Sequence, residues 1–225
     1  RMSGASKERP DELVVGLNDR DPQYHDLYIV NTRTGERELL QENEGYAGYM
    51  LDADWNVRGR MNMTEDGGSL TEMKNMDTGE WFEFLKVGQE DSGGTSPGGF
   101  NRKGDKLYGS SSIGRDKAAV VWWSPVEGAG SNPTVVFESD KADISGSITN
   151  PDTYEPEAIA VSYLRPEMTV IDNSNNIATD LANLEKLGGK DFGITDRTRD
   201  NRTWVVAFGA PEDVPTYWLW DRDSQ

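Results

Sequence analysis

The chain has 225 residues, which is enough for one large β domain or two small ones. Hydrophobic residues make up 35% and charged residues 28%, a balance typical of a strongly hydrated surface. Seven Trp, eight Tyr and six Phe still indicate a folded chain, because disordered segments are poor in aromatic residues. The net charge of −17 argues against nucleic acid as a partner, since no cluster of Lys and Arg offsets it.

The sequence contains no cysteine, which excludes disulfides and thiolate metal sites. No apolar run approaches the roughly 20 residues that span a bilayer, and the first residues lack the hydrophobic region of a signal peptide. We therefore expect no membrane partner for this chain, and its compartment stays open.

The first strand candidates are residues 12–17 and 26–31, which are short, rich in β-branched or aromatic residues, and bounded by turn residues. The second candidate runs into residues 32–36 and then into 37–40. Gly35 stands where a tight turn needs a positive φ angle. This pattern predicts a β-hairpin.

The hairpin pattern recurs along the chain with turn residues near positions 35, 79, 128, 174 and 223, a spacing of 44 to 49 residues. A further strand candidate precedes each later hairpin, at residues 49–53, 107–110, 158–163 and 204–208. Several short strands per unit, at a period in the forties, are typical of a four-stranded propeller blade. A β-sandwich with unequally spaced hairpins is the alternative.

The predicted fold is therefore all-β: a β-propeller of about four to five four-stranded blades, forming a partial or small ring. We expect residues 1–225 to be a single propeller domain or propeller fragment, with repeat units of roughly 10–45, 46–90, 95–140, 141–187 and 188–225. Residues 177–187 depart from the strand pattern because their apolar residues have helical spacing and end at two glycines. We expect a short helix there, in a connection between blades.

No catalytic motif is evident. The nearest approach to a nucleophile elbow, residues 109–114, has the wrong spacing and a β context. His25 is the only histidine and lies at the edge of a predicted strand, where a structural role is more typical than a catalytic one. We predict no catalytic residue in this chain.

Metal and cofactor motifs are absent as well. Zinc lacks His and Cys ligands. Calcium stays open because paired carboxylates lie in three predicted loops, although none has EF-hand spacing and 40 acidic residues make chance pairs common. The pairs are Asp19 with Asp21, Asp52 with Asp54, and Asp221 with Asp223. We assign no metal site and no cofactor.

Short motifs follow one another in a fixed order through nearly the whole chain. They are LNDRDP (17–22), HDLY (25–28), NTRTG (31–35), VRG (57–59), ED (90–91), FNRKGDKLY (100–108), GRD (114–116), Pro151 with EAIAV (157–161), and PTYWLWDR (215–222). This series resembles the N-terminal β-propeller of serine peptidases in the prolyl oligopeptidase and acylaminoacyl-peptidase family.

The resemblance implies a non-catalytic domain that gates peptide access to an α/β-hydrolase domain, on which it packs and which carries the Ser-Asp-His triad. Peptide substrate and hydrolase domain are then the expected partners. Arg115, Asp116, Asp221 and Arg222 are the candidate contacts to substrate or hydrolase, because an Arg beside an Asp can recognise a carboxylate or lock an interdomain salt bridge. Ion pairs within a blade, or Asp side chains that cap turns, are the alternative for all four.

Two other functions stay open. One is a stand-alone propeller that binds a protein or ligand, and the other is a small propeller glycosidase or lyase with an acidic site. An incomplete ring would also leave sheet edges exposed, so we expect either closure into a smaller ring or association of copies through those edges.

Overall fold

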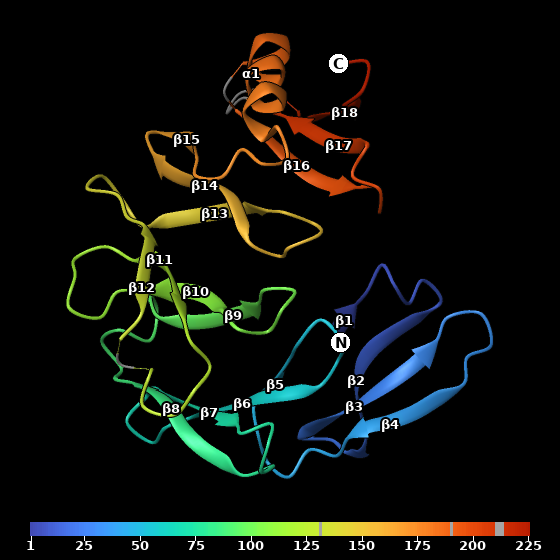
Figure 1. The fold of residues 1–225 in the computed structure, drawn as a ribbon, viewed down its shortest axis with the longest axis vertical. Coiled ribbons are helices and arrows are strands. Elements are labelled where there is room, and N and C mark those ends of the chain that lie inside the picture. Colours follow the sequence, from blue (N-terminus) through green and yellow to red (C-terminus); the bar gives the residue numbers. More distant parts are fainter. Residues whose placement is uncertain (131, 190, 210–213) are drawn as a thin grey trace. The chain divides into compact units, whose positions relative to one another are not determined.

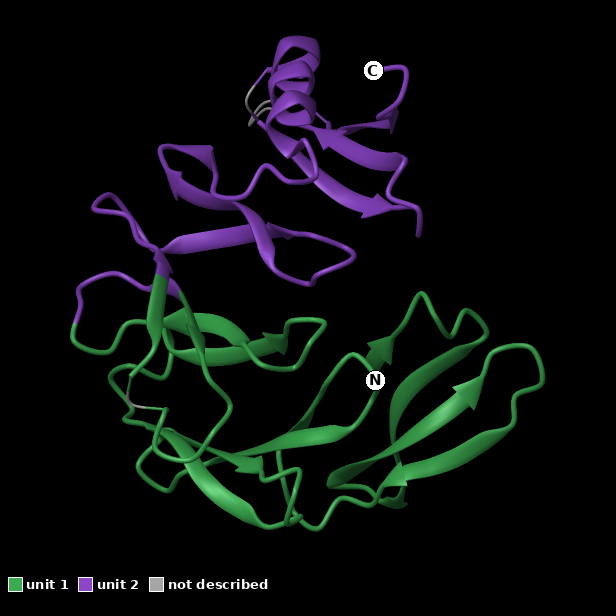
Figure 2. Ribbon diagram, in the orientation of Figure 1, with its two compact units in different colours: residues 1–114, 121–135 green, residues 115–120, 136–225 purple. Residues whose placement is uncertain are grey.

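The computed structural model describes residues 1–130, 132–189, 191–209 and 214–225. The chain forms two compact units, which Figure 2 colours separately. Unit 1 comprises Arg1–Gly114 and Val121–Val135, and unit 2 comprises Arg115–Val120 and Val136–Gln225. All four sequence-predicted contact residues and the helix lie in unit 2.

The described residues form eighteen strands and one helix, and the strands make five small sheets (Figure 1). The first sheet has the order β1-β2-β3-β4 and the second β5-β6-β7-β8. Their strands are β1 (Met2–Ala5), β2 (Glu12–Asp21), β3 (Tyr24–Asn31), β4 (Arg37–Gln41), β5 (Gly48–Leu51), β6 (Val57–Met63), β7 (Ser69–Lys74) and β8 (Trp81–Val87).

The third sheet has the order β12-β11-β10-β9, and the last two sheets have three strands each, β13-β14-β15 and β16-β17-β18. Their strands are β9 (Ser96–Phe100), β10 (Leu107–Ser111), β11 (Ala119–Trp123), β12 (Thr134–Phe137), β13 (Ile144–Thr149), β14 (Pro156–Tyr163), β15 (Arg165–Val170), β16 (Phe192–Arg197), β17 (Thr203–Phe208) and β18 (Thr216–Asp221). Consecutive antiparallel strands in small sheets are propeller blades, so the predicted all-β propeller is confirmed with five blades.

One turn shapes several hairpins. The Asn31 side chain accepts the backbone N–H groups of Arg33 and Thr34, both at 3.0 Å, and Gly35 donates to the Asn31 carbonyl at 2.8 Å. Gly35 has a φ angle of 74°, which glycine adopts without steric cost. Equivalent bonds recur in the turns that begin at Asn75, Asn150 and Asp221. The same chain reversal therefore recurs because an Asn or Asp side chain accepts backbone N–H groups of its own turn.

Each unit has its own apolar core. In unit 1, buried Val14, Leu27 and Trp55 form one cluster. The larger cluster of unit 2 joins the last two sheets to the helix, and it consists of Ile148, Ala158, Ile177, Leu181, Leu184, Trp204, Val206, Phe208 and Trp220. Burial of these side chains is the main force that holds the helix on its sheet, since short helices are marginal by themselves in water.

The helix α1 (Ile177–Gly188) confirms the helix expected at residues 177–187. The Asn173 side chain accepts the backbone N–H of Ala178 at 2.8 Å near its start, and Gly189 donates to the Glu185 carbonyl at 2.9 Å at its end. No helix in the described part of the chain is long and apolar enough to cross a membrane.

Candidate functional site

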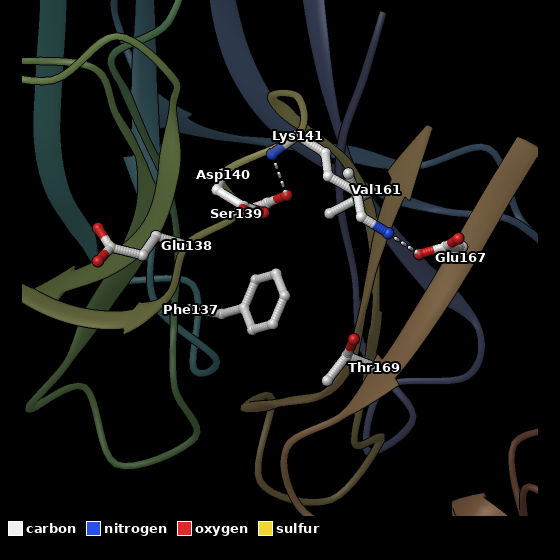
Figure 3. Close-up of a pocket in the computed structure, with 8 residues that line it drawn as sticks. All are labelled: Phe137, Glu138, Ser139, Asp140, Lys141, Val161, Glu167 and Thr169. Atoms are coloured by element: carbon white, nitrogen blue, oxygen red, sulfur yellow. Dashed lines mark hydrogen bonds and ion pairs between the residues drawn. The ribbon is translucent and has the colours of Figure 1, made fainter. Parts of the chain in front are cut away.

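A groove of about 490 Å³ lies within unit 2, between the segment that leaves β12 and the strands β14 and β15. Figure 3 shows the ring of Phe137 in the middle of the groove, with Lys141 and Glu167 reaching toward each other on one side. The lining residues are Phe137, Glu138, Ser139, Asp140, Lys141, Val161, Glu167 and Thr169. An aromatic floor with a polar rim is the composition expected of a shallow binding groove.

Electrostatics make the groove acidic. Lys141 Nζ donates to Glu167 Oε2 at 3.0 Å, and this hydrogen bond raises the pKa of Lys141. The backbone N–H of Lys141 donates to Ser139 Oγ at 3.1 Å, which fixes the segment beside the ring. Glu138 and Asp140 add two further carboxylates to the lining, so negative charge exceeds positive and a cationic group is the favoured occupant.

Arg115 lies at the margin of this groove. Its Nη1 donates to Glu138 Oε2 at 2.9 Å, and its side chain is 25% exposed. Its Nε is buried and has no hydrogen-bond partner among the described residues. Asp116 accepts a hydrogen bond from Lys117, which lowers the pKa of Asp116, and its side chain is 90% exposed. Arg115 and Asp116 thus belong to separate ion pairs.

The other two predicted residues lie at the end of β18. Asp221 accepts the backbone N–H groups of Ser224 and Asp223, both at 3.0 Å, and these bonds lower the pKa of Asp221. Arg222 instead points into the blade, where its Nη2 bonds Asp180 Oδ2 at 2.7 Å and its guanidinium stacks on Trp204 at 4.7 Å. The structure therefore engages both residues in contacts within the blade.

The acidic loops considered for calcium are occupied by protein partners. Asp19 pairs with Arg37 at 2.6 Å, and Asp52 pairs with Arg58 at 3.4 Å while accepting backbone N–H groups of its own loop. Within the residues that the structure describes, no group of three or more His, Asp or Glu side chains is arranged to hold a metal ion.

Sequence reasoning missed two buried carboxylates of unit 2. Asp180 on α1 is 1% exposed and binds both Trp220 and Arg222. Glu157 on β14 is fully buried, and its Oε2 has no hydrogen-bond partner in the described part of the chain. Glu157 carried a signal in the sequence, because a charged residue opens the otherwise apolar stretch 158–161. Asp180 carried none, since acidic residues are common in the first turn of a helix.

Five blades with repeated hairpin turns define the class of this protein as a β-propeller. No family model matches the sequence. Two curated peptidases do match it. Dipeptidyl aminopeptidase BIII of Pseudoxanthomonas mexicana is 36% identical over 225 residues, which is 100% of this chain and 32% of that protein. Dipeptidyl peptidase family member 6 of Caenorhabditis elegans is 23% identical over 224 residues, 95% of this chain and 30% of that protein.

A solved structure shows the same fold. A prolyl endopeptidase structure matches 98% of this chain and 34% of its own, with a TM-score of 0.53 and 12% identity. The chain is a homologue of the dipeptidyl aminopeptidase, and the resemblance to the propeller of prolyl oligopeptidase and acylaminoacyl-peptidase relatives is confirmed. It spans about a third of the length of the curated relatives that it matches.

Proposed function

We propose that this chain is the propeller domain of a serine peptidase-like protein, where it packs on an α/β-hydrolase domain and gates the access of peptides. The proposal rests on the 36% identity to a dipeptidyl aminopeptidase, which runs through all five blades without a gap in coverage. The catalytic groups then lie in the hydrolase domain, and this chain contributes none.

Gating follows from shape. Propeller blades surround a channel, and a channel admits an extended peptide while it excludes a folded domain. The acidic surface adds a second effect, because a net charge of −17 attracts positively charged peptide ends and repels acidic ones. Substrate choice by size and charge is therefore the contribution that we assign to this domain.

Among the predicted contact residues, Arg115 and Asp116 are the stronger candidates for a contact to substrate or hydrolase domain. Asp116 is 90% exposed, and the 25% exposed side chain of Arg115 lies at the groove margin through its bond to Glu138. Asp221 and Arg222 already form hydrogen bonds within their blade. A contact of either residue to substrate or hydrolase domain would have to form in addition to those hydrogen bonds. We also propose that copies of the chain associate through exposed sheet edges.

The first experiment compares this chain with the longer protein on chromogenic dipeptide, acyl-ester and glycoside substrates, with and without calcium. We expect turnover of peptide substrates by the longer protein and none by the 225-residue chain. Turnover by the chain alone that survives repurification would contradict the assignment, and turnover of a glycoside would favour an acidic propeller glycosidase.

A second experiment tests the groove margin in the longer protein. Arg115→Ala should change kcat/KM for peptides about threefold or more while the melting temperature stays within about 2 °C, because Glu138, the ion-pair partner of Arg115, is 68% exposed and stays hydrated when Arg115 is removed. Lys74→Ala, at the end of β7 in unit 1, is the matched control and should leave turnover unchanged. Loss of stability with unaltered turnover would show that Arg115 only braces its blade.

A further inference from the structure

The turn that joins β14 to β15 consists of one residue, Leu164, since β14 ends at Tyr163 and β15 begins at Arg165. Leu164 has a φ angle of 64°. A bulky side chain is an outlier in this left-handed region, which glycine and asparagine enter more readily. The backbone at Leu164 is therefore strained, and such strain persists only where other interactions maintain it.

Contacts within the chain do not explain why a leucine occupies this turn. Trp55 and Tyr154 also have positive φ angles, of 68° and 59°, but Trp55 is only 4% exposed and Tyr154 is partly buried, so both side chains pack against the protein. Leu164 is 96% exposed, and its neighbour Tyr163 is 53% exposed. These two residues form an apolar tip whose leucine packs against almost nothing in the described part of the chain.

The exposure of the apolar tip does not depend on a missing strand. A further strand beside β15 would pair along the edge of the sheet, whereas Leu164 lies at the end of the sheet, beyond the last cross-strand pair, Tyr163 with Arg165. The equivalent turns of the first two sheets are polar, with Pro22 and Gln23 after β2 and residues 64–68 (TEDGG) after β6. The apolar character of the tip is thus particular to this blade.

The apolar tip is continuous with the candidate groove of unit 2. Val161 and Glu167, which line the groove on facing strands (Figure 3), form a cross-strand pair two residues away from the pair of Tyr163 and Arg165. Because side chains alternate between the two faces of a sheet, both pairs project from the same face. The tip and the groove therefore lie on one side of unit 2.

Arg115 belongs to the same side of unit 2. It bonds Glu138, which lines the groove. Like Leu164, it lies in a turn between the second and third strands of a sheet, here between β10 and β11. A protruding apolar anchor with charged residues around it is the composition of a protein interface, in which the apolar centre supplies most of the binding energy.

The partner for this surface follows from the function proposed above, on which this inference rests. The chain spans about a third of the length of the curated relatives that it matches, and the proposed function assigns a hydrolase domain to the remainder. We propose that the apolar tip docks in an apolar pocket of that hydrolase domain, with Arg115 at the polar rim of the contact. Burial of the leucine side chain then offsets the strain of its backbone.

Cysteine labelling measures this contact directly, because the chain has no cysteine of its own. Leu164→Cys should react with a maleimide at least about tenfold more slowly in the longer protein than in the 225-residue chain, since a buried thiol reacts only when the contact opens. Peptide mass spectrometry reports the reaction at each position. Thr153→Cys is the matched control, because residue 153 is exposed in the turn at the other end of β14, and it should react equally in both proteins.

Equal labelling of residue 164 in the two proteins would overturn the proposal. Slow labelling in the 225-residue chain by itself would also overturn it, because a second copy of the chain would then cover the tip. Equal protection of residues 153 and 164 in the longer protein would show a general loss of access rather than docking of the tip.

Relief of the strain gives a second readout. Leu164→Gly should raise the melting temperature of the chain by about 2 °C, because glycine adopts this φ angle without a clash of its Cβ atom. The same substitution should lower the melting temperature of the longer protein by about 2 °C or more, since the apolar contact is lost. A rise in both proteins would overturn the docking.

Turnover separates this inference from the proposed function. A longer protein that cleaves peptides while residue 164 labels at the rate of the chain would refute the docking and leave the proposed function intact. A longer protein without peptide turnover would refute the proposed function, and with it the partner named for the tip.

Discussion

Unit 2 buries two carboxylates in neighbouring blades and treats them in opposite ways. Asp180, on α1, is 1% exposed and accepts hydrogen bonds from Trp220 Nε1 at 3.1 Å and from Arg222 Nε at 2.9 Å. Glu157, on β14, is fully buried and accepts one described bond, from Asn150 Nδ2 at 2.9 Å. One carboxylate has a complete set of donors and the other has a bare oxygen, Oε2.

The difference appears in how each site holds its charge. Burial raises the pKa of Glu157, and the nearby Asp172 adds to the rise, while the side chains of Asn150 and Asn175 and the charge of Arg197 oppose it. Burial in turn lowers the pKa of Arg197, whose Nη2 bonds the Thr149 carbonyl at 2.6 Å rather than Glu157. Arg197, which lies near Glu157 without bonding it, therefore stabilises the charged form of Glu157 less than Arg222 stabilises that of Asp180 by direct hydrogen bonds.

Unit 1 repeats the paired arrangement. Asp26 on β3 is 1% exposed and accepts Nε and Nη2 of Arg20, both at 2.8 Å, as well as the backbone N–H of Asn43 at 2.7 Å. The Arg20 hydrogen bond lowers the pKa of Asp26. Paired buried carboxylates therefore stabilise a blade, whereas burial disfavours the charged form of Glu157.

The largest expected effect comes from unpairing Asp180. Arg222→Ala should lower the free energy of unfolding of unit 2 by about 3–5 kcal/mol, because it leaves a buried carboxylate without its cation. Urea denaturation followed by tryptophan fluorescence measures the loss. The control is Arg202→Ala, whose pair with Asp223 is exposed and should cost less than about 1 kcal/mol. Equal losses in both variants would contradict the structural role of Arg222.

A smaller loss is expected at the paired carboxylate of unit 1. Asp26→Asn should cost about 2 kcal/mol, since the Arg20 side chain is 41% exposed and stays hydrated when its partner is neutral. The lowered pKa of Asp26 also fixes the sign of the pH effect. Its contribution is complete above the ordinary value of 3.8 and is lost as the pH falls through the lower folded value. Acid titration of the variant should therefore lack that loss, and parallel acid curves would contradict the pairing.

The hairpins of this fold could be predicted from the sequence because their causes are local. Gly35 and Gly79 lie in turns that a nearby Asn side chain also fixes, so a few adjacent residues are sufficient. The turn at Asn150 was harder to find, since Tyr154 takes the positive φ position, at 59°, that glycine takes elsewhere. The division into five repeat units stays a prediction.

The contacts that join distant residues could not be predicted. Asp180 and Arg222 are separated by 42 positions, and the residues around each of them do not indicate that the two side chains form an ion pair. Arg222 stood out only as an Arg beside an Asp, a pattern that fits an interdomain contact and a blade contact equally well. The groove around Phe137 depends in the same way on the packing of β14 and β15 against the segment after β12.

The unpaired carboxylate should respond with the opposite sign. Glu157→Gln should raise the free energy of unfolding by about 1 kcal/mol at pH 7, because it removes a buried charge that lacks a full set of donors. The raised pKa means that the folded state of the wild type holds its proton to higher pH than the unfolded state. Wild-type stability therefore falls as the pH rises from the ordinary value of 4.5 through the folded value.

In Glu157→Gln this fall should disappear, and the two proteins should have equal stability near pH 4. Glu83→Gln, an exposed position on β8, is the control and should follow the wild-type curve at every pH. Destabilisation of Glu157→Gln at pH 7 would mean that the charge of Glu157 is needed to hold Arg197. Glu157 and Asp180 would then both stabilise their blades through their charges, and would differ only in how strongly they do so.

The smallest effect is expected where a carboxylate and its cation are both exposed. Lys141→Ala removes the partner of Glu167 at the candidate groove, and the two side chains are 50% and 60% exposed. Water then replaces the lost hydrogen bond, so the free energy of unfolding should change by less than about 0.5 kcal/mol, and by less still in 0.5 M NaCl. A loss comparable with that of Arg222→Ala would show that burial does not set the strength of these pairs. A near-zero value, beside a large loss at Arg222, would show that desolvation of the carboxylate decides how much its cation matters.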